Sequence, residues 1–173
     1  MTNECFKITR IPLTRQESRK ELLSMKLPAA VLDLFDGNFV HPTLTYRCEE
    51  PYYIFSTPVL PDGNHITPLW ERGMVVTAYQ HIGSQGRFIS FNIENPEDVT
   101  VIGPSFKSVV AALLIDLWEH EISEMELREV ARLFQFRHLN ELLGECESKA
   151  RSETLAGYCM WRAQVCEFYD AAA

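Results

Sequence analysis

The chain has 173 residues, of which 46% are hydrophobic and 23% are charged, and its formal net charge is −8. This balance is that of an ordinary folded domain, so it argues against intrinsic disorder, and no apolar run approaches the roughly 18 residues of a membrane span. An acidic chain disfavours nucleic acid and anionic membranes as partners and favours a basic one, although an acidic balance is also an ordinary means of staying in solution.

The distribution of charge is more informative than its total. Residues 1–26 carry six Lys or Arg against three Glu, whereas residues 27–98 carry three Arg against nine Asp or Glu. The middle of the chain is therefore acidic, and it is the segment in which we expect a basic partner to bind.

The N-terminal sequence Met1–Lys7 lacks the apolar segment of a secretory signal, so we expect a cytoplasmic protein. The cysteines are odd in number and show no C-x-x-C spacing, which fits reduced thiols better than a disulfide framework or a zinc site. They are Cys5, Cys48, Cys146, Cys159 and Cys166.

Two short helices are predicted first. Thr14-Arg-Gln-Glu17 fits the S/T-x-x-E capping box, which predicts a helix from there to about Met25. Leu27-Pro28 ends this helix and starts a second one, since proline is tolerated in a first turn, and Asp36-Gly-Asn38 supplies a C-terminal stop.

The segment from Pro42 to Pro68 is rich in Thr, Tyr and Pro. We predict short or edge strands at 44–47 and 52–57, a turn at 61–63 and a further strand at 66–70.

The centre of the chain predicts a β-hairpin and a third strand. Strands at 74–80 and 87–93 pair through a loop at 81–86 that contains two glycines. A turn at 95–98 and a short strand at 99–102 follow.

The most apolar helix is predicted next, with Ser105 as its N-cap and Phe106 as its first residue. Ile89, Phe91 and Ile93 share one face of their strand, and we expect the apolar stripe of this helix to pack on that face.

After Trp118 the pattern predicts three more helices, at about 124–134, 139–146 and 152–169. Trp161, Val165 and Phe168 in the last helix are too apolar for exposure, so we expect it to pack on the body or on a second subunit. The chain as a whole predicts one α+β domain, 1–173. Its core, at about 12–120, is an antiparallel sheet packed against helices, and its C-terminal helical extension covers about 121–173.

No motif that carries chemistry is complete. His120-Glu121 resembles the start of a zinc-protease helix, but residue 124 is Glu where the second histidine is needed. The neighbouring glutamates fall on several helix faces and fit a solvated charge run, and the five histidines are scattered along the chain. We therefore predict no catalytic residue, no metal and no cofactor, and chelation is expected to leave the melting temperature unchanged.

The order of these signals resembles the SUKH superfamily, whose members include bacterial immunity proteins and a yeast cell-wall regulator. The matching features are Glu17 in the first helix, Leu27-Pro28 opening the second, the corner at Asp36-Gly-Asn38, and Ser105-Phe106 at the start of a long apolar helix. The resemblance covers about residues 12–120.

The resemblance implies a non-enzymatic binding protein that neutralises a toxin, and a basic nuclease toxin would suit the acidic middle segment. Two alternatives stay open: a small hydrolase or transferase that uses Glu and His residues, and a homodimeric structural subunit. We expect the partner surface at strand ends and turns, where loops commonly carry binding function. Its candidate residues are Glu49, Glu50, Tyr52, Tyr53, Glu71, Glu94, Glu97 and Asp98.

Overall fold

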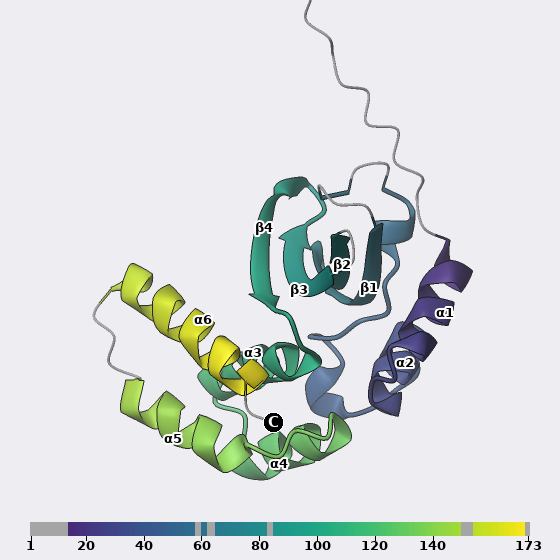
Figure 1. Ribbon diagram of the computed structural model, residues 1–173. Helices are drawn as coiled ribbons and strands as arrows, with labels where there is room; N and C mark the ends of the chain where they lie inside the picture. Colours follow the sequence, from purple (N-terminus) through teal and green to yellow (C-terminus); the bar gives the residue numbers. More distant parts are fainter. Residues whose placement is uncertain (1–13, 58–59, 62–64, 83–84, 150–153, 172–173) are drawn as a thin grey trace, which may run out of the picture.

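The computed structural model describes residues 14–57, 60–61, 65–82, 85–149 and 154–171 (Figure 1). Its sheet is antiparallel with the strand order β1-β2-β3-β4, the strands being β1 (His65–Arg72), β2 (Val75–Ile82), β3 (Gln85–Asn92) and β4 (Asn95–Gly103). The α-helices are α1 (Arg15–Ser24), α2 (Ala29–Phe35), α3 (Phe106–Glu119), α4 (Glu124–Leu133), α5 (Leu139–Lys149) and α6 (Leu155–Ala171). In Figure 1, α1 and α2 lie beside β1 and α6 approaches β4. The predicted α+β class is confirmed.

The signals that predicted the first two helices are present in the structure. The Glu17 N–H donates to Thr14 Oγ1 at 3.2 Å and the Thr14 N–H donates to Glu17 Oε2 at 3.1 Å, so both halves of the capping box form. Gly37 follows α2 with a φ of +76°, a left-handed conformation that favours glycine.

Two of the predicted strands are wrong. Residues 44–47 lie at the end of a short 3₁₀ helix, η1 (Pro42–Leu44), and in the turn after it, and residues 52–57 contain a second one, η2 (Tyr53–Phe55). The backbone N–H groups at 52–54 donate to a side chain of β1 instead of to a neighbouring strand. In the described part of this segment, a single bridge between Glu49 and Glu71 joins the backbone to the sheet.

The predicted turn at 95–98 is wrong as well. The chain turns at Ile93 and Glu94, where Asn92 Oδ1 accepts the Glu94 N–H at 2.9 Å, and β4 already begins at Asn95. Pro96 is tolerated there because β4 is an edge strand. Residues 62–63 of the turn expected at 61–63, and residues 83–84 of the hairpin loop, lie outside the described residues.

The two faces of the sheet bury different cores. The smaller core consists of Ile54, Ile66, Val76, Ala78, Ile89 and Phe91, with Phe55 and Leu60 packed against it. The larger core joins α3 to Leu69, Trp70 and Phe88 on the opposite face. The predicted packing of α3 on the Ile89 and Phe91 face is therefore wrong. Ile54, Phe55 and Leu60 cover that face, and Ile93 lies in the β3–β4 turn.

A bulge in β1 shapes the face that carries the helices. The register between β1 and β2 shifts between Pro68 and Trp70, and both Leu69 and Trp70 reach the larger core. The cross-strand row that continues from Trp70 is polar: Thr77, then Ser90, then Thr100. This face therefore presents hydroxyl groups to the helical layer.

The C-terminal helices extend the larger core. Trp161, Val165 and Tyr169 of α6 are buried in it, which confirms the predicted packing of this helix on the body. Phe168, which we expected to be buried with them, is 65% exposed. No helix in the described ranges combines the length and the apolar composition needed to cross a bilayer.

The position of Leu117 in α3 gives a test of this core. Its side chain is fully buried, so Leu117→Ala is expected to lower the free energy of unfolding by about 2–5 kcal/mol. Met125→Ala on α4 is the control, because Met125 is exposed, and it should change the value by less than about 0.5 kcal/mol. Urea unfolding of both variants measures the difference, and equal midpoints would contradict the packing described.

Candidate functional site

The structure places seven of the eight predicted partner-binding residues on the surface. Glu49, Glu50 and Tyr52 lie between η1 and η2, and Tyr53 is the first residue of η2. Glu94 lies in the β3–β4 turn, and Glu97 and Asp98 lie on β4. Each of these side chains is exposed.

Glu71 is the exception, because it is only 2% exposed. Its Oε2 accepts the N–H groups of Tyr52 and Tyr53, each at 3.0 Å, and its Oε1 accepts that of Ile54 at 2.8 Å. The prediction that Glu71 is an exposed contact residue is therefore wrong. Its carboxyl group instead fixes the start of η2 on the sheet.

Removing this anchor gives a second test of the structure. Glu71→Ala leaves three N–H groups without their acceptor, and we expect it to lower the free energy of unfolding by about 1.5–3 kcal/mol. Glu97→Ala removes an exposed carboxyl group and is expected to change it by less than about 0.5 kcal/mol. Chemical denaturation followed by circular dichroism compares the two, and a Glu71 variant as stable as the Glu97 variant would refute the anchoring role.

Aromatic side chains are concentrated on the surface of residues 39–53. Phe39 is 75% exposed, Tyr46 81%, Tyr52 69% and Tyr53 47%. The rings of Tyr52 and Tyr53 pack edge to face with their centroids 5.4 Å apart. We refer to these four side chains as the aromatic surface. Tyr52 and Tyr53 are among the contact residues predicted from the sequence, whereas Phe39 is not.

Acidic side chains border the aromatic surface. Phe39, Glu49 and Glu50 line the same groove, which has a volume of about 270 Å³. Glu49 Oε2 accepts the Gly73 N–H at 3.5 Å, and the Ile93 N–H donates to Met74 O at 2.9 Å. Glu49, the β1–β2 turn and the β3–β4 turn with Glu94 therefore lie along the same end of the sheet.

The charge of Glu50 is partly compensated. Its Oε1 lies 2.6 Å from Arg15 Nη1, and the same guanidinium donates to Phe35 O at 2.6 Å and to Pro51 O at 3.2 Å. Glu50 thus helps to hold α1 against this segment, whereas Glu49 and Glu94 offer their charge more directly to a partner.

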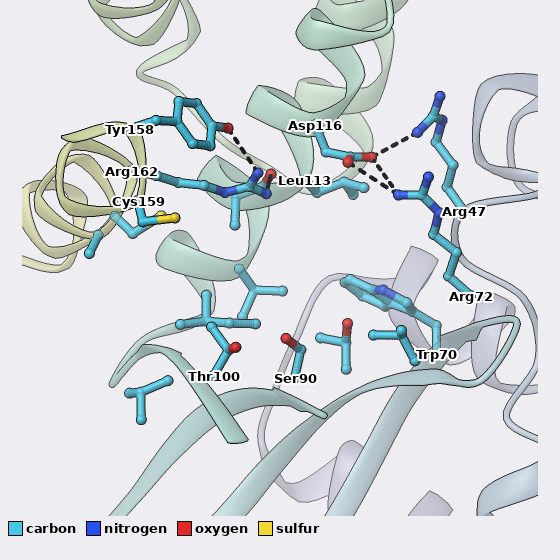
Figure 2. A pocket seen from close by; sticks show the side chains of 18 residues that line it. Arg47, Trp70, Arg72, Ser90, Thr100, Leu113, Asp116, Tyr158, Cys159 and Arg162 are labelled. Carbon is cyan, nitrogen blue, oxygen red and sulfur yellow. Dashed lines mark hydrogen bonds and ion pairs between the residues drawn. The ribbon is translucent and has the colours of Figure 1, made fainter. Parts of the chain in front are cut away.

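A pocket of about 420 Å³ lies between the sheet and helices α3 and α6 (Figure 2). The hydroxyl groups of Thr77, Ser90 and Thr100 lie on its strand side, and Asp116 of α3 and Arg162 of α6 lie on its helical side. It forms because the polar row of the sheet faces the helices at this point.

Asp116 is held by two arginines at the mouth of the pocket. Its Oδ2 accepts from Arg47 Nη1 at 2.7 Å, and both of its carboxylate oxygens accept from Arg72 Nη1 at 3.1 Å. Asp116 and Arg47 are mostly buried, so this ion pair is screened less than an exposed one. With two guanidinium groups on it, the carboxylate is poorly placed to serve as a general base.

The α6 side of the pocket is built on Arg162. Its guanidinium donates to Ala112 O at 2.9 Å and to the Tyr158 hydroxyl at 3.1 Å, and Tyr158 in turn hydrogen-bonds Glu119. Partial burial, together with the Glu119 contact, raises the pKa of Tyr158 to about 12. The phenol therefore stays protonated at neutral pH.

Serine, threonine and cysteine side chains line the pocket, and these residue types act as nucleophiles when a base lies beside them. No histidine is among the described residues that line it, so its hydroxyl groups have no imidazole base beside them. Cys48 and Cys146 do not line this pocket. Burial raises the pKa of the Cys146 thiol to about 11 and also raises that of Cys48, which keeps both thiols in their weakly nucleophilic form.

Residues with metal-ligand character meet elsewhere in the structure. Glu21, His65 and His81 each place a ligand atom within 4.8 Å of the others, at the end of β1 and β2 opposite the pocket. The sequence did not indicate this cluster, because 44 residues separate Glu21 from His65.

The chain matches no protein-family model, no curated protein and no solved structure. The resemblance to the SUKH superfamily is therefore a hypothesis that rests on the sequence pattern alone.

Proposed function

We propose that this chain is a non-enzymatic protein-binding domain that recognises a basic protein partner through the aromatic surface and its acidic border. The observation that carries the proposal is the exposure of Phe39, Tyr46, Tyr52 and Tyr53 within residues 39–53. In line with the SUKH resemblance, the partner is a toxin that the domain neutralises in the cytoplasm.

Exposed aromatic side chains are what a binding surface needs. Tyrosine is enriched among the residues that dominate binding energy, because it buries a large ring at a low cost in side-chain entropy. Tyr52 and Tyr53 are also held in place, since their backbone N–H groups are fixed by Glu71. A fixed backbone reduces the ordering cost that a partner would otherwise meet.

The acidic border supplies the preference for a basic partner. Residues 27–98 carry nine acidic against three basic side chains, and Glu49 and Glu94 lie at the same end of the sheet as the aromatic surface. A surface whose charges share one sign attracts a partner of opposite charge, which raises the association rate, and it repels partners of like charge.

The two alternatives have less support. A hydrolase or transferase in the pocket would need a free base, whereas Asp116 is bound by Arg47 and Arg72. The observation that favours a homodimeric subunit is the exposure of three apolar side chains of α6, namely Leu155, Met160 and Phe168. These are spread along the helix, while its main apolar side is already buried on α3.

The aromatic surface is tested by removing its rings. The double variant Tyr52→Ala/Tyr53→Ala is expected to weaken binding to a partner captured from the source cell by about 30-fold or more, which corresponds to a hot spot of about 2 kcal/mol. Leu155→Ala, an exposed change on α6, is the matched control and should leave affinity unchanged. Titration calorimetry measures both. Loss of affinity in the control alone would favour the α6 surface instead.

The acidic border is tested by reversing its charge. Glu94→Lys/Glu97→Lys/Asp98→Lys is expected to slow association and to weaken its dependence on salt, with a smaller effect on dissociation. The same kinetics are then measured for Glu49→Lys. If neither variant changes the association rate or its salt dependence, the partner does not use this border.

A further inference from the structure

Two histidines and a glutamate converge between α1 and the sheet, at the end away from the pocket. His65 of β1 and His81 of β2 are direct cross-strand partners, so both rings lie on the helical face, with their centroids 5.0 Å apart. Glu21 of α1 meets both side chains. The strand register and the position of the helix together assemble the cluster.

The spacing within the cluster is close to that of a metal site. Glu21 Oε1 lies 2.5 Å from His65 Nε2, and Glu21 Oε2 lies 3.7 Å from His81 Nε2. In tetrahedral zinc sites, metal–ligand bonds of about 2.0–2.2 Å place neighbouring ligand atoms about 3.3 Å apart. The two observed separations lie on either side of this value, so small side-chain rotations suffice to place an ion between them.

One of the three ligand atoms makes no hydrogen bond to the described residues. His81 Nε2 is buried and has no hydrogen-bond partner among the described residues, although it lies 3.7 Å from Glu21 Oε2. A buried polar atom without a partner is costly, and an ion at this position would satisfy it. The unsatisfied Nε2 atom of His81 distinguishes this cluster from an ordinary His–Glu hydrogen bond, in which each polar atom has its partner.

Neighbouring side chains hold the ligands in place. Thr67 Oγ1 donates to Glu21 Oε2, and the Tyr79 ring packs edge to face on the His81 ring with the centroids 4.7 Å apart. Tyr79 lies over Gly86, where the Cβ of any other residue would overlap its hydroxyl group. Supporting contacts of this kind orient ligands in metal sites.

We propose that Glu21, His65 and His81 form a zinc site, with the ion bound by the two Nε2 atoms and the Glu21 carboxylate. Two imidazoles and one carboxylate are an established zinc ligand set that leaves a fourth position open. All three side chains are about one-third exposed, so the site lies near the surface although the Nε2 atom of His81 is itself buried. The site is separate from the proposed partner surface, and it replaces the sequence-based expectation that no metal binds.

The bound ion joins segments that are distant in the chain. It links α1 to β1 and β2 directly, in addition to the hydrogen bond from Thr67. Because binding is favoured only in the folded state, zinc raises the melting temperature of the protein.

The test uses the full chain, freed of metal and of any affinity tag, and titrated with zinc chloride. We expect one zinc ion per chain and a higher melting temperature. His65→Ala and His81→Ala should each weaken binding at least about tenfold, and Thr67→Val should weaken it less. His120→Ala, at an exposed histidine outside the cluster, should leave binding unchanged. Unchanged affinity in both ligand variants would overturn the site.

Two measurements on the unaltered chain keep the test decisive if a variant fails to fold. Cobalt(II) in place of zinc should give the visible absorption of a tetrahedral site with nitrogen and oxygen ligands. A thiolate charge-transfer band would instead assign the ion to cysteine and overturn the proposal. Zinc should also shift the imidazole nitrogen resonances of His65 and His81, and shifts confined to the other histidines would contradict it.

Discussion

The buried carboxyl group of Glu71 determines how the chain covers its own sheet. It accepts three consecutive backbone N–H groups from residues 52–54, which would otherwise need partners in a fifth strand. Because this segment forms a short 3₁₀ helix at the carboxyl group, Ile54 enters the smaller core while Tyr52 and Tyr53 remain outside. One interaction thus closes a face of the sheet and exposes the aromatic surface.

The pocket follows from the same arrangement. Since Ile89 and Phe91 are covered by Ile54, Phe55 and Leu60, the opposite face of β3, with Ser90, is the one that meets α3 and α6. Hydroxyl side chains are too small to fill the space beneath a helix, and Arg47, Arg72 and Arg162 stay near its edges. The row of hydroxyl groups on the strand side of the pocket is therefore the counterpart of the apolar face on the other side of the sheet.

Local signals in the sequence predicted much of this fold. The Thr14–Glu17 capping box, Gly37 after α2 and the start of α3 at Phe106 depend only on residues close in the chain, and each was correct. The alternation of apolar and polar residues also placed Ile89 and Phe91 correctly on one face of β3, but it does not indicate which part of the chain covers that face. That depends on contacts between distant residues, such as Glu71 with Tyr53, Arg47 with Asp116, and Glu21 with His65, for which the sequence pattern contains no signal.

The bulge at Leu69 divides β1 into two halves. Odd-numbered residues face the helices in the first half, and even-numbered residues face them in the second half. Before it, His65 and Thr67 face the helices, and after it, Trp70 and Arg72 do, so the alternation is offset by one residue. Deleting Leu69 would restore a regular strand in which both halves keep their faces, because Pro68 and Trp70 already pair with Ala78 and Thr77, which are neighbours on β2. A residue inserted or removed elsewhere in β1 would instead turn one half over, and either the histidine cluster or the Glu71 carboxyl group would then point to the wrong side of the sheet. The extra residue at the bulge therefore serves the larger core, to which it adds the fully buried side chain of Leu69 next to that of Trp70.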